Sequence, residues 1–313
     1  MKKTGLLLLV LMATMAVAQQ DTPNAAGVIP TSMNEPFVRY QTPTAMDIYC
    51  SGFISKDRMP DAHYVNGGLQ TPSTTKFTNG DMVFLSGGGY QVGQQYSILR
   101  ELKDMNAYEL YVGQKKLLAE TGHPYGDVAR VQIVDVRSHS AIAEVRFSCD
   151  PVNPGDIAVP FAEKQPISFR EPGHFDRFMP SNNKLTARIV LGKDFDGFMG
   201  TGGKVYMNMG SNQGAKVGDY FRVVRSYTAT LEDPVDSLSF KASISEDSQK
   251  NPPTIEGKSY VDHSKGPNIH VADLPRRAVG EVVILSVTPT TSTGMIVFAL
   301  EDVHAGDKVE LDQ

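Results

Sequence analysis

Short apolar runs alternate with clusters of Gly, Pro, Asn and Asp along most of this chain of 313 residues. The length of these runs and their content of β-branched residues predict strands. One segment, residues 105–121, instead has apolar residues at three- and four-residue spacing and predicts a helix, which Gly113 interrupts. In the first half of the chain the predicted strands lie at residues 81–89, 95–102, 127–136, 141–147 and 157–161.

The chain contains an internal repeat. The stretch KVGDYFRVVR at residues 216–225 is a near-double of QVGQQYSILR at 91–100, with a Val-Gly turn, an alternating run and a final Arg in each. The stretch NGDMVFLSGGGYQVG is matched by GGKVYMNMGSNQGAKVG, and residues 125–161 are matched by residues 279–311. Three blocks matched in the same order indicate two copies of one module. With slips of one or two residues, the last block pairs Gly126 with Gly280, Ser140 with Ser292, Gly155 with Gly306 and Asp156 with Asp307.

Matched Gly and Asp residues predict the turns of each copy. Glycine supplies the positive φ that tight turns require, and an Asp carboxylate accepts backbone N–H bonds in a turn. Because the connections are short and no βαβ rhythm repeats, the fold class is mainly β: two small antiparallel barrel or sandwich modules with at most one or two helices. The predicted structural turn residues are Gly93, Gly126, Gly155, Asp156, Gly218, Asp219, Gly280, Gly306 and Asp307.

The length and the hydrophobic content of 41% suffice for two domains, each with its own core. The long insertion in the second copy is polar and rich in Ser, Pro, Lys and Asp, and it predicts a mobile loop. Whether that loop binds a partner or is a bare surface insertion stays open. The predicted parts are a signal peptide at 1–18, a disordered leader at 19–45, module 1 at 46–162, a linker at 163–184, and module 2 at 185–313 with the loop at about 228–270.

The N-terminus has the pattern of a secretory signal. Lys2 and Lys3 precede an apolar run from Leu6 to about Met15, and small residues at Ala16 and Ala18 predict cleavage after Ala18. A membrane anchor would need about 18 to 20 apolar residues, and this run is shorter. No Cys follows the cleavage point, which disfavours a lipid anchor. We expect an exported protein, periplasmic or extracellular, without an integral membrane span after cleavage.

The two cysteines, Cys50 and Cys149, each lie beside a predicted strand. An exported chain meets an oxidising compartment, in which thiols tend to pair, so we expect a disulfide between them. The alternatives are two buried thiols that act as small apolar side chains, or a Cys-His nucleophile.

The residue pattern gives no cofactor or metal site. The net charge of −5 is interspersed along the chain, which disfavours a nucleic-acid partner. His263 and His270 lie near Asp262 and Asp273, but a flexible loop would hold a metal poorly. The glycine run at 86–93 does not lead into a helix, as phosphate binding would require, so we expect a hairpin turn.

One candidate catalytic pair remains, formed by Asp127 and Glu281 at the matched Gly-acid positions. They would fit a secreted hydrolase acting on glycans or peptides, although the chain has no Trp to stack on sugars. Equivalent places in two copies favour a structural role instead, because a catalytic acid needs one particular environment. We therefore expect a protein that is not an enzyme. The stretch GHFDRF at 173–178 is expected to hold the linker against the modules.

Residues 205–225 followed by 274–311 resemble the C-terminal module of flagellar assembly protein T, and are similar to a module of bacterial envelope proteins that often carry LysM repeats. DIYCSGFI and CDPVNPGDIAVPF resemble the first copy in the LysM-bearing proteins, but this chain has no LysM segment. The resemblance implies a non-catalytic envelope module that contacts an envelope protein or peptidoglycan through loops. The residues that match its motif are Gly214, Gly218, Asp219, Phe221, Val223, Arg225, Pro275, Gly280, Glu281, Ser292, Gly306 and Asp307.

Overall fold

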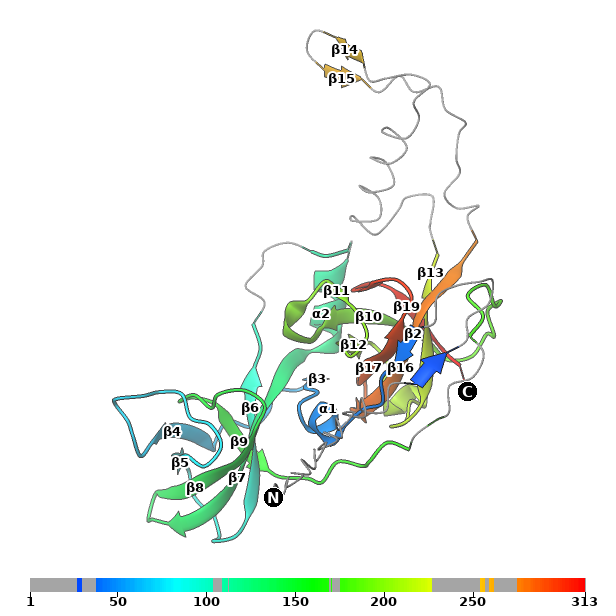
Figure 1. Ribbon diagram of the computed structural model, residues 1–313. Coiled ribbons are helices and arrows are strands. Elements are labelled where there is room, and N and C mark those ends of the chain that lie inside the picture. Colours follow the sequence, from blue (N-terminus) through cyan, green and yellow to red (C-terminus); the bar gives the residue numbers. More distant parts are fainter. Residues whose placement is uncertain are drawn as a thin grey trace, which may run out of the picture.

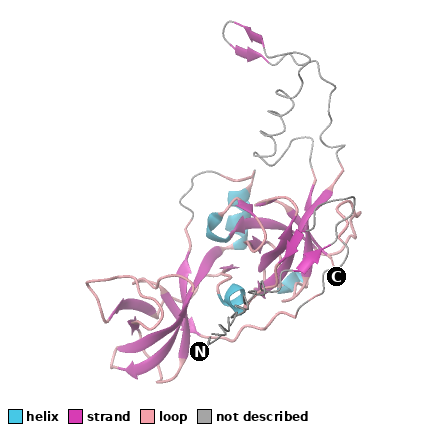
Figure 2. Ribbon diagram, viewed as in Figure 1, coloured by secondary structure: helices cyan, strands magenta, loops and turns pink. Residues whose placement is uncertain are grey.

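The structure is a computed structural model, and it contains two closed antiparallel β-barrels (Figures 1 and 2). This confirms the predicted fold class, with the barrel as the form of each module. The described residues are 27–29, 38–103, 109–111, 113–168, 170, 175–226, 254–256, 259–261 and 275–312.

Barrel 1 is formed by the first copy of the repeat. Its interior is filled by alternate residues of the strands, such as Val65, Leu85, Ile98 and Val131. A further strand, β3 (Phe53–Ser55), pairs with β7 outside the closed ring. The order around the ring is β4 (Tyr64–Gly68), β5 (Met82–Ser86), β8 (Ser140–Ser148), β7 (His123–Val136), β6 (Gln95–Glu101) and β9 (Ile157–Pro160).

Barrel 2 repeats this topology strand for strand. Its interior holds Ile189, Met207, Val223 and Val282. These residues are equivalent, in this order, to the four core residues of barrel 1, which are Val65, Leu85, Ile98 and Val131. The order around the ring is β10 (Thr186–Gly192), β12 (Lys204–Met207), β17 (Ser292–Ala299), β16 (Arg277–Val287), β13 (Tyr220–Arg225) and β19 (Lys308–Leu311).

The strand registers correct one part of the sequence alignment. Ala129 pairs with Ile98 next to a β-bulge in barrel 1, and Gly280 pairs with Val223 next to the same bulge in barrel 2. Gly280 is therefore equivalent to Ala129 and not to Gly126. From Ala129 and Gly280 to the Gly-Asp turn, the two barrels align without an insertion or deletion. The predicted pairing of Ser140 with Ser292 is therefore also wrong. Alignment by glycine identity failed because the bulge, not a glycine, sets the register here.

Gly126 and Gly280 lie inside strands β7 and β16, not in turns. Their surroundings differ, as expected of positions that are not equivalent. A Cβ on Gly280 would lie 2.6 Å from the carbonyl oxygen of Phe298, whereas a Cβ on Gly126 would only touch the side chain of Leu102 at 3.4 Å. Gly280 is thus needed for the close approach of β16 and β17.

The other four predicted glycines lie in tight turns with positive φ, which is 88° at Gly93, 93° at Gly155, 90° at Gly218 and 103° at Gly306. Each of these turns stands directly before a barrel strand. The same conformation at matched places explains why the repeat keeps glycine there.

The helix predicted at 105–121 is shorter in the structure. Only α2 (Gln114–Thr121) is helical, because Gly113 has a left-handed φ of 87° directly before it; residues 105–108 lie outside the described residues. The Tyr111 hydroxyl and the Gln114 amide both donate hydrogen bonds to the Val190 carbonyl, at 3.3 and 3.1 Å. This segment of the first copy therefore packs on barrel 2 (Figure 1).

The end of the predicted leader is ordered. Strands β1 (Gly27–Ile29) and β2 (Val38–Tyr40) pair with each other, and Tyr40 is buried against barrel 2. A capping box formed by Thr44 and Asp47 begins α1 (Ala45–Tyr49). The signal peptide and most of the loop at 228–270 lie outside the described residues, apart from the pairing of β14 (Thr254–Glu256) with β15 (Ser259–Val261).

Helix α1 and strand β3 lie between the two barrels. The hydroxyls of Thr291 and Thr293 donate hydrogen bonds to the carbonyls of Ile54 and Gly52, at 2.6 and 3.0 Å. The predicted disulfide is confirmed: Cys50, at the end of α1, is bonded to Cys149, next to β8. The short remaining elements are η1 (Lys193–Phe195), β11 (Phe198–Met199), η2 (Ser211–Gln213) and β18 (Val303–His304).

Replacing the turn glycines should separate backbone strain from steric contact. Gly155→Ala places its Cβ in open space, so we expect a loss of only about 1 to 2 kcal/mol from positive φ. Gly306→Ala also brings its Cβ to 2.8 Å from the Tyr111 ring, so we expect about 1 to 3 kcal/mol more. Urea unfolding of both variants measures the difference, and equal losses would contradict this account.

Candidate functional site

The Arg that ends each copy of the repeated phrase is bound to the Asp of the Gly-Asp turn. In barrel 1, Arg100 donates from Nε to Oδ1 of Asp156 and from Nη2 to Oδ2, both at 2.7 Å, and from Nη2 to the Pro151 carbonyl at 2.8 Å. The Asn153 backbone N–H donates to the same carboxylate at 2.7 Å. This two-pronged geometry is the strongest form of an Arg–carboxylate pair.

Barrel 2 reproduces the four bonds. Arg225 donates from Nε and Nη2 to Asp307 at 3.0 and 2.8 Å and from Nη2 to the Asp302 carbonyl at 2.8 Å, while the His304 N–H donates to Asp307 at 2.8 Å. Asp219 caps the other matched turn by accepting the Lys216 N–H at 2.8 Å, and Gln94 does so in barrel 1. The motif residues therefore bind one another within each barrel, and they form its scaffold.

The two candidate catalytic carboxylates lie on different barrels, and each has partners of its own. Asp127 accepts the Gly52 N–H at 2.9 Å and pairs with Lys164 at 2.7 Å. Glu281 pairs with Arg170 at 2.8 Å. Their matched roles were inferred from a wrong alignment, because Glu281 is equivalent to Arg130 of barrel 1.

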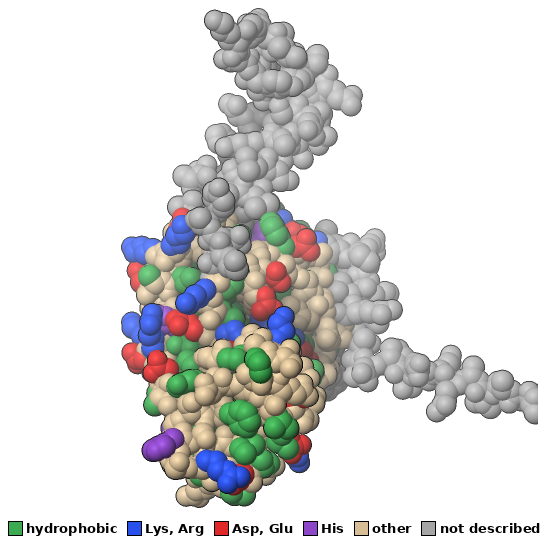
Figure 3. Space-filling model, turned by 90° about the vertical axis from the view of Figure 1, so that its left-hand side faces the viewer, with side chains coloured by type: hydrophobic (Ala, Val, Ile, Leu, Met, Phe, Trp, Pro, Cys, Tyr) green, Lys and Arg blue, Asp and Glu red, His purple; other side chains and the backbone are tan. Residues whose placement is uncertain are grey.

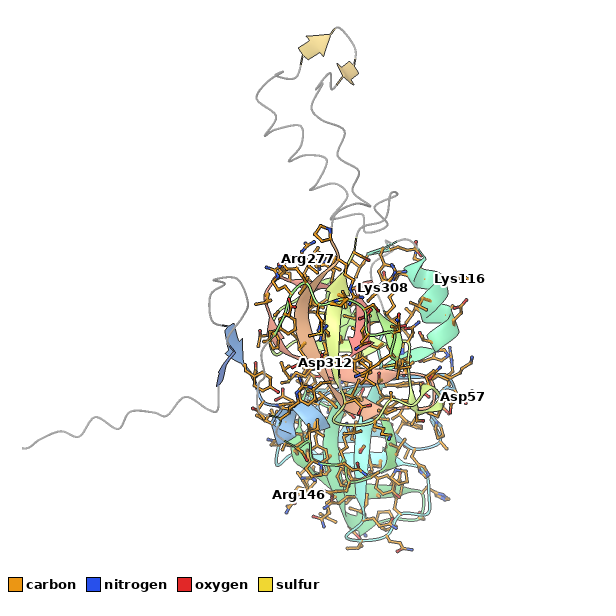
Figure 4. All side chains as sticks on the ribbon, turned by 90° about the vertical axis from the view of Figure 1, so that its right-hand side faces the viewer. Asp57, Lys116, Arg146, Arg277, Lys308 and Asp312 are labelled. Carbon is orange, nitrogen blue, oxygen red and sulfur yellow. A yellow bond between two sulfur atoms is a disulfide. The ribbon has the colours of Figure 1, made fainter. Side chains whose placement is uncertain are left out.

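Both of these cations belong to the predicted linker, which is therefore fixed to each barrel by an ion pair. Arg170 also pairs with Asp312 at 3.0 Å, and its guanidinium lies 4.3 Å from the centre of the Tyr220 ring. From the stretch GHFDRF, Phe175 packs edge-on against Phe298 of barrel 2 with ring centres 4.8 Å apart. Asp312 is labelled on barrel 2 in Figure 4.

Burial is the main cause that raises the pKa of Glu281 to about 7. The nearby Asp312 acts in the same direction, whereas Arg170 and Arg222 favour the charged form and oppose the shift.

The site that sequence reasoning missed is a cavity of about 250 Å³ between α1 and barrel 1. It is built by α1, by the neighbouring strands β6, β7 and β8, and by the chain from Phe161 after β9 to the start of the linker. Its one sequence signal is Arg130, the single cation in the strand run at 127–136. Its lining includes the side chains of Met46, Tyr49, Asp127, Arg130, Phe147, Phe161 and Lys164.

The cations of this α1 cavity differ in their partners. Lys164 donates to Asp127 and to the Ile48 carbonyl, at 2.7 and 3.0 Å. The Arg130 guanidinium lies over Phe161, 5.0 Å from the ring centre, and 5.8 Å from that of Tyr49. A second cavity of about 450 Å³ shares Phe161 and is lined by Gln94, Gln95, Tyr96, Pro160 and Glu163.

Among the described residues, no group of three or more His, Cys, Asp and Glu side chains is placed to hold a metal ion. His263 and His270 lie outside these residues. No helix in the described part of the chain is both long and apolar enough to cross a membrane.

No family model fits this chain, and no curated protein is significantly similar to it in sequence.

Removing the carboxylate charge from the two matched turns should cost different amounts. Arg225 is 7% exposed and Arg100 is 32% exposed. Asp307→Asn removes the nearer of the two carboxylates that face the buried Arg225 guanidinium, since Glu301 stays at 3.6 Å, and we expect a loss of about 2 to 4 kcal/mol. Asp156→Asn leaves the partly hydrated guanidinium of Arg100, and we expect a loss of about 1 to 3 kcal/mol in the free energy of unfolding. Chemical denaturation measures both, and a larger loss for Asp156→Asn would contradict the burial argument.

The raised pKa of Glu281 predicts a pH dependence of stability. The folded state binds this proton more tightly than the unfolded chain, so the stabilisation is fully present below about pH 4.5 and is lost as the pH rises through about 7. In Glu281→Gln, we expect the free energy of unfolding to fall less steeply between about pH 5 and 7 than in the wild type. Glu120→Gln, on an exposed position of α2, is the control. An unchanged slope in Glu281→Gln would contradict the assignment.

Proposed function

We propose that this protein is an exported, non-catalytic component of the bacterial cell envelope, periplasmic or extracellular, that binds an envelope protein or peptidoglycan. The signal-like N-terminus supports export. The disulfide between Cys50 and Cys149 suits an oxidising compartment, since such bonds are rare in the cytosol.

The observation that carries the proposal is the use that the chain makes of its repeated polar residues. Arg100 and Arg225 are bound to the Gly-Asp turns of their own barrels. Residues that two copies share in this way serve the scaffold, so a binding function belongs to what differs between the copies. The two barrels differ most after these arginines, where one has the segment with α2 and the other has the insertion at 228–270.

The resemblance to the C-terminal module of flagellar assembly protein T points the same way, because it implies an envelope module with a structural or partner-binding role. The matching residues Gly218, Asp219, Arg225, Gly306 and Asp307 are the turn and ion-pair residues of barrel 2. A flagellar role does not follow from them, since residues of this kind maintain the fold.

The alternative, a secreted hydrolase, would need two carboxyl groups placed on either side of one bond. Asp127 and Glu281 lie on different barrels, and each is held by a linker cation. This arrangement supports the non-catalytic proposal.

Co-sedimentation with purified peptidoglycan sacculi tests the proposal. The chain from Gln19 onward and a variant without residues 228–270 are compared at equal concentration. We expect the longer protein to sediment and the variant to stay in solution, because long loops on a rigid scaffold commonly bind partners. Sedimentation of both would place the wall contact on the barrels.

If neither form sediments, peptidoglycan is excluded as the partner. Cross-linking in the periplasm then tests for an envelope protein. A blank result in both experiments would contradict the proposed function.

A further inference from the structure

We propose that the α1 cavity binds an extended peptide through a carboxylate that pairs with Arg130. The inference goes beyond the proposed function, since it does not depend on which envelope component the protein contacts or on the insertion at 228–270.

Arg130 has no counter-ion in the described part of the chain. No described carboxylate lies within ion-pair distance of it, no described group accepts a hydrogen bond from its guanidinium, and its Nε is fully buried without a partner. Polar groups buried in this way nearly always have a partner. A ligand carboxylate would supply one, and the planar guanidinium fits the two oxygens of a carboxylate.

The charged side chains that line the α1 cavity carry one net positive charge. Lys164 is paired with Asp127 at 2.7 Å, so the charges of these two cancel. Glu163 lines the second cavity and not this one, and it accepts a hydrogen bond from the Tyr49 hydroxyl at 2.8 Å. Arg130 is therefore the lining cation that remains for an anion.

The equivalent place on barrel 2 shows how such a position is satisfied. Arg130 stands opposite Ser97 and Phe147, and its equivalent Glu281 stands opposite Arg222 and Phe298. Neither residue belongs to its barrel's core, and both flank core residues, so both side chains point outward.

On barrel 2 the chain's own linker occupies this surface. Arg170 pairs with Glu281, and Phe175 packs edge-on against Phe298. The charge at the equivalent position of barrel 1 is reversed. Where Glu281 binds a basic group, Arg130 would bind an acidic one. An extended segment that bears a carboxylate and an apolar side chain is thus the occupant that the internal comparison indicates.

The walls of the cavity suit such a segment. The rings of Tyr49 and Phe161 stack with centres 6.0 Å apart, and Phe147 and Met46 also line the cavity, so an apolar side chain can be buried there. Met46 is 53% exposed and lies at the open side.

The size of the cavity indicates part of a chain rather than a large free molecule. Pockets for drug-sized ligands have about 300 to 1,000 Å³, and the α1 cavity has about 250 Å³. The second cavity shares Phe161 and is lined by Gln95, an exposed residue whose amide is able to hydrogen-bond to a peptide backbone. A peptide can use both cavities, whereas a small organic acid would fill only the first.

The face of barrel 1 that holds the apolar side chains of Figure 3 is a separate feature. Barrel 1 exposes Tyr64, Leu69, Val92 and Val134, none of which lines the α1 cavity. The proposed site is defined by its cation and rings, not by this exposed apolar surface.

NMR titration of the full chain from Gln19 with short peptides at low salt tests the inference. The probe is N-acetyl-Ala-Glu-Ala-Phe-amide, and its matched control has Gln in place of Glu. We expect the Glu peptide to shift backbone amides of α1 and β7, and the Gln peptide to bind at least about ten-fold more weakly, because a charge-assisted hydrogen bond is lost. This comparison uses the wild-type protein alone, so it does not depend on the folding of a variant.

A third peptide, N-acetyl-Ala-Ala-Phe with a free carboxyl terminus, distinguishes an acidic side chain from a terminal carboxylate as the source of the charge. Tighter binding of the Glu peptide than of its Gln control identifies an acidic side chain as the source of the charge. Tighter binding of the third peptide than of the same peptide with a C-terminal amide identifies a terminal carboxylate. Either result supports the proposal. Phenylacetate is the last arm, and binding of this acid alone would overturn the assignment to a peptide.

Arg130→Gln should weaken binding of the preferred peptide at least about ten-fold. Arg146→Gln, on the neighbouring strand β8 and labelled in Figure 4, is the matched control, because Arg146 is 47% exposed and pairs with Glu144 at 2.9 Å outside the cavity. Equal binding by Arg130→Gln and wild type, amide shifts confined to other surfaces, or no binding of any peptide at millimolar concentration would overturn the proposal.

Discussion

The ion pair between the last Arg of the repeated phrase and the Asp of the Gly-Asp turn is the interaction on which each barrel depends. It joins the end of β6 or β13 to the turn that starts the closing strand. The same turn bonds to the first strand of the ring, since Gly155 and Gly306 donate to the carbonyls of Val65 and Ile189, each at 2.8 Å. Three strands that are far apart in the sequence thus meet at one Gly-Asp turn, and the ring closes there.

Once the ring is closed, the outward-facing residues are free to differ. At one matched position barrel 1 has Arg130 and barrel 2 has Glu281. The two barrels use this freedom in opposite ways. Barrel 2 is covered by the chain itself, through Arg170 and Phe175, whereas barrel 1 keeps a cavity whose Arg130 has no counter-ion among the described residues. The duplicated scaffold has thus diverged at its surface. The linker covers this surface on barrel 2, whereas on barrel 1 the equivalent surface lines a cavity.

The segments between the barrels belong to one copy by sequence and to both by contact. Cys50 and Cys149 hold α1 to barrel 1, while Asp47 of the same helix pairs with Lys204 of barrel 2 at 2.6 Å. In the same way α2 follows β6 of barrel 1 but packs on β10 of barrel 2. These crossed contacts place the two barrels side by side, with the linker fixed to each of them by an ion pair.

The sequence by itself determined the strands, the duplication, the disulfide and the turns at Gly93, Gly155, Gly218 and Gly306. The strands and turns rest on local chemistry, because an alternating run or a positive φ needs only its own neighbours along the chain. The disulfide was predicted differently, from two cysteines in a chain with an export signal. The tertiary structure alone decided that Gly280 matches Ala129 and that the linker cations Lys164 and Arg170 pair with Asp127 and Glu281. It also decided that segments far apart in the sequence enclose Arg130. Register at a bulge, the choice of a counter-ion and the shape of a cavity depend on residues brought together from distant parts of the chain, and no local pattern records which of them will meet.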